Sequence, residues 1–93
     1  MSDGALRRTV EICNERGLHA RASAKFVKLA GQFDAQVKVS RDGHTVMAQS
    51  IMGLMMLAAG IGSSVEIEAE GPQAAEAIDA LARLICDRFE EEK

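Results

Sequence analysis

Apolar and polar residues alternate along four stretches of this chain and recur at helical spacing along three others. The alternation at 6–13, 35–40, 44–48 and 65–70 predicts half-buried β-strands. Apolar residues spaced three and four apart predict amphipathic helices over 20–30 and 74–89. A third, short helix is expected within 49–59, where almost every side chain is apolar. In the first strand Arg8 falls on the side of Leu6, Val10 and Ile12, so the alternation is imperfect there.

The residues between these stretches agree with this interpretation. Asp42-Gly43 predicts a type I′ hairpin turn, which needs a positive φ at both central residues. Ser50 is a good N-cap for the short helix, and Gly31 marks the end of the first one. The last four residues, 90–93, are expected to form a frayed and solvated tail.

The resulting order is β-α-β-β-α-β-α within a single domain, residues 1–93. Four strands that each have one apolar face need helices on that face only. We therefore expect an α+β fold, an open-faced β-sandwich in which a four-stranded antiparallel sheet is covered on one face by three helices. Leu54 and Leu57 are expected in the core.

The composition of the chain argues against some classes of function. The net charge of -3 argues against nucleic acid as a partner. The longest apolar stretch, 51–61, is far shorter than the roughly 18 residues of a membrane span, so no membrane insertion is expected. Cys13 and Cys86 form no CxxC motif, which favours reduced thiols, and the polar N-terminus lacks a signal peptide. We expect a cytoplasmic location.

The candidate chemistry lies in Gly17-Leu18-His19-Ala20-Arg21, where a glycine-marked turn enters the first helix. A helix start exposes unpaired N–H groups and favours an anion. Imidazole is a nucleophile, and a guanidinium grips phosphate oxygens well. The segment therefore suggests that His19 accepts a phosphoryl group. On these residues alone, a solvated His–Arg pair near a turn is the more common situation.

Two other interpretations of the histidines have less support in the sequence. His44 flanks the hairpin turn with no arginine or helix start beside it, so we interpret it as a surface residue. A metal site built on His19 and His44 lacks a carboxylate or thiol to complete it. No metal and no cofactor are expected.

Two motifs resemble one known family. Gly17-Leu18-His19-Ala20-Arg21 resembles the active-site motif of the HPr phosphocarriers of the bacterial phosphoenolpyruvate-dependent phosphotransferase system. Ser50-Ile51-Met52-Gly53-Leu54-Met55 resembles the regulatory serine motif of that family. The resemblance covers roughly residues 6 to 89 and includes the order of the elements.

The resemblance implies a phosphoryl carrier rather than a stand-alone enzyme. It implies that phospho-enzyme I phosphorylates His19 on Nδ1, that Arg21 pairs with the phosphoryl group, and that an enzyme IIA domain of a sugar transporter receives it. It also implies that an HPr kinase/phosphorylase, in bacteria that have one, modifies Ser50. We expect both partner proteins to bind a rim made by the side chains of Arg16, Ala20, Ile51, Met52 and Met55, and we expect the carrier to be a monomer.

One position departs from the family pattern. Ala22 stands where the family usually has proline, and alanine keeps an N–H group in the first helical turn. Two other functions remain open: a carrier in a nitrogen-related regulatory branch, and a binding regulator that never carries phosphate. The motifs do not separate the two branches, whereas an intact His19 and Arg21 argue against the pure binding regulator.

Overall fold

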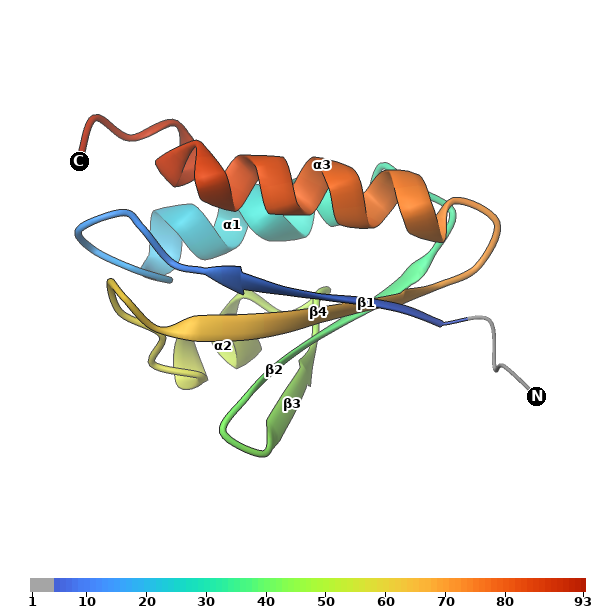
Figure 1. Cartoon of the computed structure of the whole chain (residues 1–93), viewed down its shortest axis with the longest axis horizontal. Coiled ribbons are helices and arrows are strands. Elements are labelled where there is room, and N and C mark those ends of the chain that lie inside the picture. The colour runs from blue at the N-terminus through green and yellow to red at the C-terminus, as the bar shows by residue number, and fades with distance from the viewer. Residues whose placement is uncertain (1–4) are drawn as a thin grey trace.

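The computed structural model describes residues 5–93, which form four strands and three α-helices in the predicted order (Figure 1). The elements are β1 (Leu6–Glu11), α1 (Ala20–Ala30), β2 (Gln36–Arg41), β3 (His44–Met47), α2 (Ile51–Met56), β4 (Ser64–Glu70), α3 (Ala74–Cys86) and the 3-10 turn η1 (Arg88–Glu90). The strands form one antiparallel sheet in the order β1-β4-β2-β3. The expected open-faced α+β sandwich is therefore confirmed.

The core lies between the sheet and the helices. Helices α1 and α3 lie side by side along the sheet, and α2 contacts α1 and β3 (Figure 1). Alternate strand residues are buried beneath the helices, namely Val10, Val37, Val39, Val65, Ile67 and Ala69. Leu54 and Leu57 are 0% and 4% exposed, which confirms that these two leucines of the apolar stretch belong to the core.

The first strand joins the core only through its second half. Leu6 is 44% exposed, so the expectation that it is buried is wrong, whereas Val10 and Ile12 are buried. The irregular Arg8 has a partner outside the core, because its Nη2 donates to Oδ1 of Asp79 on α3 at 2.7 Å. Near its start β1 therefore meets the rim of α3 through an exposed ion pair, which contributes about 1 kcal/mol or less.

The two local signals in the middle of the chain are confirmed. Asp42 and Gly43 have φ values of 50° and 82°, as a type I′ turn requires, and Arg41 pairs with His44 across the hairpin. The Oγ atom of Ser50 accepts a hydrogen bond from the Gly53 N–H at 2.9 Å, so Ser50 caps α2.

The end of α3 differs from the expectation. Periodicity extended this helix to Phe89, but the helix ends at Cys86. Arg88, Phe89 and Glu90 have φ values of 56°, 54° and 66°, so three consecutive residues take a left-handed backbone. This turn still buries Phe89 completely, which explains why its apolar side chain matched the helical pattern. This turn also contacts α1.

Gly17 determines how the chain passes from β1 into α1. Its φ is +64°, and a Cβ atom at this position would lie 2.3 Å from the backbone oxygen of Ala59. The same oxygen accepts the N–H of Leu18 at 3.0 Å. Only glycine combines this backbone conformation with so close an approach, so the loop before α1 rests directly on the segment after α2.

Replacing Gly17 by alanine should destabilise the fold by more than the roughly 1–3 kcal/mol typical of a non-glycine residue in a left-handed conformation, because a backbone clash is added. Gly43→Ala is the matched control, since Gly43 also has a positive φ but open space around it. Urea unfolding measures the loss of unfolding free energy in each of the two variants. Equal losses of unfolding free energy in the two variants would show that the contact with Ala59 has no energetic role.

Candidate functional site

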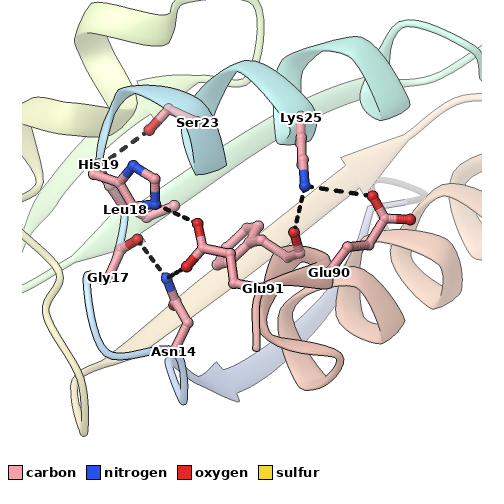
Figure 2. A network of polar contacts seen from close by, with 9 residues as sticks. Asn14, Gly17, Leu18, His19, Ser23, Lys25, Glu90 and Glu91 are labelled. Carbon is pink, nitrogen blue, oxygen red and sulfur yellow. Dashed lines mark hydrogen bonds and ion pairs between the residues drawn. The ribbon is translucent and has the colours of Figure 1, made fainter. Parts of the chain in front are cut away.

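The loop between β1 and α1 is held by its own hydrogen bonds. Asn14 is fully buried, and its Nδ2 donates to the carbonyl oxygen of Gly17 at 2.9 Å (Figure 2). The Ser23 hydroxyl donates to the carbonyl oxygen of Leu18 at 3.2 Å. The first bond closes the loop on itself and the second ties the loop to α1, so the residue that follows Leu18 has a fixed position.

That residue is His19, the N-cap of α1. Its backbone is extended, with φ -74° and ψ 179°, and its side chain makes no capping bond to the helix. The first turn of α1 contains no acidic residue. The first N–H groups of the helix therefore lack a side-chain cap, and the positive end of the helix dipole lies beside the imidazole.

An open pocket of about 470 Å³ lies near this helix start. Four cationic residues line it, Arg16, Arg21, Lys25 and Lys93, together with Glu15 and the three glutamates of the C-terminal tail. Arg16 and Arg21 are exposed. Within residues 5–93 the guanidinium of Arg21 has no hydrogen-bond or ion-pair partner, so it is available to an incoming anion.

The closest partner of the imidazole comes from the other end of the chain. His19 Nε2 lies 2.5 Å from Oε2 of Glu91, and the two side chains are 22% and 15% exposed (Figure 2). The other oxygen of the carboxylate, Oε1, accepts a hydrogen bond from Asn14 Nδ2 at 3.0 Å. His19 is therefore only partly exposed, because Glu91 covers its Nε2 edge.

Burial of the Glu91 carboxyl would by itself raise its pKa. The hydrogen bonds from Asn14 and His19, together with electrostatic attraction to His19 and Arg16, outweigh burial and lower the pKa of Glu91 below its usual value. The carboxylate is thus present as an anion beside the imidazole at neutral pH.

The expectation that residues 90–93 form a frayed tail is wrong, whereas their solvation is confirmed for all but Glu91, which is partly buried. Lys25 Nζ donates to the carbonyl oxygen of Phe89 at 2.7 Å and lies 3.5 Å from Oε1 of Glu90 (Figure 2). The N–H of Glu15 donates to the carbonyl oxygen of Lys93 at 3.0 Å. The acidic residues are held because the site supplies cations and N–H groups at the place where the left-handed turn directs them.

Helix α2 supplies an exposed apolar surface next to the site. Ile51, Met52 and Met55 are 40%, 71% and 41% exposed. Met55 lines a shallow hollow together with Arg16 and His19, whereas Ile51 and Met52 lie outside that hollow. Ala20 is also exposed.

The structure also gives the positions of the other residues named in the sequence analysis. Ser50 is exposed at the start of α2, and His44 is exposed at the start of β3. Ala22 is fully buried within α1, which begins at Ala20 without a proline. Cys13 and Cys86 are free thiols. Across residues 5–93 no cluster of three or more potential metal ligands occurs, and no helix is long and apolar enough to cross a membrane.

The sequence analysis missed three residues of the site: Asn14, Lys25 and Glu91. Asn14 looked like an ordinary turn residue, and Lys25 like a solvated position on α1. Glu91 sits in a run of acidic residues that normally indicates solvated chain. One signal was available: the isolated apolar Phe89 directly before that run had to be buried somewhere.

Comparison with known proteins gives a consistent result. The family model described as "PTS HPr component phosphorylation site" matches residues 6–87. The chain is 60% identical over 86 residues to the phosphocarrier protein HPr of Cupriavidus necator, covering 92% of this chain and 97% of that protein. It is 40% identical over 86 residues to the phosphocarrier protein NPr of Shewanella violacea, covering 92% and 94%.

A solved structure is similar over almost the whole chain. The crystal structure of HPr from Thermoanaerobacter tengcongensis superposes with a TM-score of 0.90 at 45% identity, covering 95% of this chain and 99% of that one.

The lowered pKa of Glu91 makes a prediction about stability and pH. Because its pKa is lower in the folded state than in the unfolded chain, the carboxylate stabilises the fold at pH values above its unfolded pKa of about 4.3. This stabilisation is lost as the pH falls through the lower folded pKa. The free energy of unfolding of wild type should therefore exceed that of Glu91→Gln by roughly 1–2 kcal/mol at pH 6. This difference should disappear under acid conditions.

Urea unfolding at several pH values between 3 and 7 measures this gap. Glu92→Gln is the control, because Glu92 is an exposed neighbour in the same tail and its removal should produce no such pH-dependent difference. A gap between wild type and Glu91→Gln that stays constant down to pH 3 would contradict the assignment.

Proposed function

Because this chain belongs to the HPr family of phosphocarriers of the phosphotransferase system, we propose that His19 accepts a phosphoryl group from phospho-enzyme I and passes it to an enzyme IIA domain. The observation that carries the proposal is the surroundings of His19. The imidazole stands at an uncapped helix start, with Arg16, Arg21 and Lys25 around an open pocket and with Nε2 already occupied by Glu91.

The nucleophile on this proposal is Nδ1 of His19. With Nε2 bonded to Glu91, Nδ1 is the nitrogen available to phosphorus. The exposed Arg21 guanidinium and the N–H groups of the first turn of α1 stabilise the phosphoryl oxygens. The donor or acceptor histidine approaches in line from the partner protein, which a partly exposed ring at the surface permits.

Partner proteins bind beside His19. The exposed side chains of Ile51, Met52 and Met55 form an adaptable apolar surface, because methionine has several low-energy rotamers. Ala20 leaves the helix start unobstructed, and Arg16 adds positive charge next to the pocket. We propose that enzyme I and the enzyme IIA domain bind this same surface in turn, and that the carrier acts as a cytoplasmic monomer without metal or cofactor.

Ser50 is the proposed regulatory position. Its exposed hydroxyl caps α2, so a kinase can reach it, and a phosphate there meets the positive end of the helix dipole. Phosphorylation adds roughly two negative charges next to the apolar residues that bind partners. The modified surface is then costly to desolvate and repels acidic groups on a partner.

A nitrogen-related branch is the second candidate, because the chain is 40% identical to an NPr phosphocarrier over nearly its full length. The 60% identity to an HPr favours the sugar branch. Phosphoryl transfer to purified enzyme IIA domains of both branches distinguishes the two.

The first test of the proposal is phosphorylation with phosphoenolpyruvate and purified enzyme I. Wild type should gain one acid-labile phosphate, which intact-mass measurement detects, and His19→Ala should gain none. His44→Ala removes the exposed histidine of β3 and should be phosphorylated like wild type. Absence of phosphate on wild type, with an enzyme I shown to be active on another carrier, would favour the binding regulator.

The second test concerns Ser50. Protein phosphorylated on Ser50 should accept phosphate on His19 more slowly by about tenfold or more, because charge at a docking surface changes association rates on this scale. Its far-ultraviolet circular dichroism should remain that of the unmodified protein. The variant Ser50→Ala distinguishes the role of the helix cap from the effect of the phosphate charge. It should lose about 1 kcal/mol of stability but accept phosphate on His19 at the rate of the unmodified protein. Equal rates for modified and unmodified protein would refute the regulatory role.

A further inference from the structure

Within residues 5–93, Glu91 is the one charged group that forms a hydrogen bond or ion pair with the His19 ring. We propose that Glu91 is a positioning residue for phosphoryl transfer: its carboxylate holds the proton of the His19 ring on Nε2, leaves the lone pair of Nδ1 free, and stabilises the positive charge that the ring gains. This inference rests on the proposed carrier function.

The contact defines where the ring proton lies. A carboxylate anion only accepts hydrogen bonds, so the hydrogen between Nε2 and Oε2 of Glu91 belongs to the imidazole. A neutral imidazole has a single N–H group. When that group is on Nε2, Nδ1 carries a lone pair and faces away from the carboxylate, because the two nitrogens point in different directions from the ring.

The carboxylate also matches the charge change of the reaction. The lone pair of Nδ1 forms the new N–P bond while the P–N bond of the donor breaks, and the electron pair of that bond returns to the donor histidine. The proton on Nε2 stays in place, so the ring of His19 becomes cationic. A fixed anion next to Nε2 stabilises that cation, as an aspartate does for histidine in hydrolytic triads.

The position of Glu91 is built into the fold rather than a chance contact of a tail. Asn14 is fully buried and holds Oε1 at 3.0 Å, while Oε2 contacts His19 (Figure 2). Arg88, Phe89 and Glu90 are three successive left-handed residues, a conformation that persists only where the surroundings stabilise it and that is concentrated at functional sites.

The tail is anchored independently of His19. Phe89 is 0% exposed, Lys25 binds its carbonyl oxygen, and the carbonyl of Lys93 accepts the N–H of Glu15. These contacts make it possible to remove the charge of Glu91 while the remainder of the tail stays attached, which is what a test of positioning needs.

The test uses the full-length chain and the variant Glu91→Gln, which keeps the shape of the side chain and removes its charge. Asp87→Asn is the matched control, because Asp87 is an exposed carboxylate of the turn before Glu91 and is not among the residues that line the pocket. The initial rate of phosphorylation by phospho-enzyme I should fall about tenfold in Glu91→Gln, the lower end of the loss seen when the hydrogen-bond partner of a metal-bound histidine is removed. It should stay within about twofold of wild type in Asp87→Asn.

Nitrogen-15 and proton NMR of the unphosphorylated proteins supplies a readout that a purely structural role would not change. Wild type and Asp87→Asn should show His19 protonated on Nε2 with a downfield, slowly exchanging proton. Glu91→Gln should lose that protected signal while the backbone spectrum of the core is unchanged.

The outcomes separate this inference from the function on which it rests. If wild type is phosphorylated on His19 and Glu91→Gln reacts equally fast, the positioning role is overturned and the carrier function stands. An equal slowing of Asp87→Asn and Glu91→Gln also overturns it, since the loss of one negative charge near the site then explains the effect. If wild type takes up no phosphate, the carrier function fails and the positioning role fails with it.

Discussion

The apolar face of the four-stranded sheet is the constraint on which the rest of the structure depends. Side chains such as Val39, Val65 and Ile67 are almost completely removed from water, and the helices must remain on that face to cover them. The connection from β1 to α1 therefore has to bring the chain sharply from the sheet to the helix layer. It does so at Gly17, which touches the backbone of Ala59. The residue that starts the helix is consequently held at the edge of the molecule, where it meets solvent.

This geometry also explains why the site is assembled from distant parts of the chain. The loop after β1 supplies Asn14, the start of α1 supplies His19, and the turn after α3 supplies Glu91. Cations and carboxylates line the same open pocket, so the tail neutralises part of the positive charge of Arg16 and Lys25 before any ligand arrives. A site of this kind suits exchange of an anionic group between proteins, because it offers charge and orientation without enclosing the group.

The local sequence signals were reliable where one interaction dominates. The Asp42-Gly43 turn, the Ser50 cap and the start of α1 depend on the backbone preferences of one or two residues, and all three are confirmed. The same reasoning failed for Leu6 and for the tail after α3. In β1 the alternation of apolar and polar residues predicts which face of the strand is buried. It does not predict how much of that face the helices cover. Phe89 satisfied the helical period although a left-handed turn places it in the core.

The sequence by itself determined the order of the elements, the sheet with one apolar face and the motif around His19, because these depend on periodicity and on residues close together in the chain. Only the tertiary structure decided that Glu91 contacts the imidazole from 72 positions away. That contact depends on the burial of Phe89, on the left-handed turn and on the hydrogen bond from Asn14, and none of these leaves a periodic pattern. A run of acidic residues is normally stabilised more by water than by contacts with the protein. Here the fold brings cations and hydrogen-bond donors close enough that the contacts of Glu91 stabilise it more than water does.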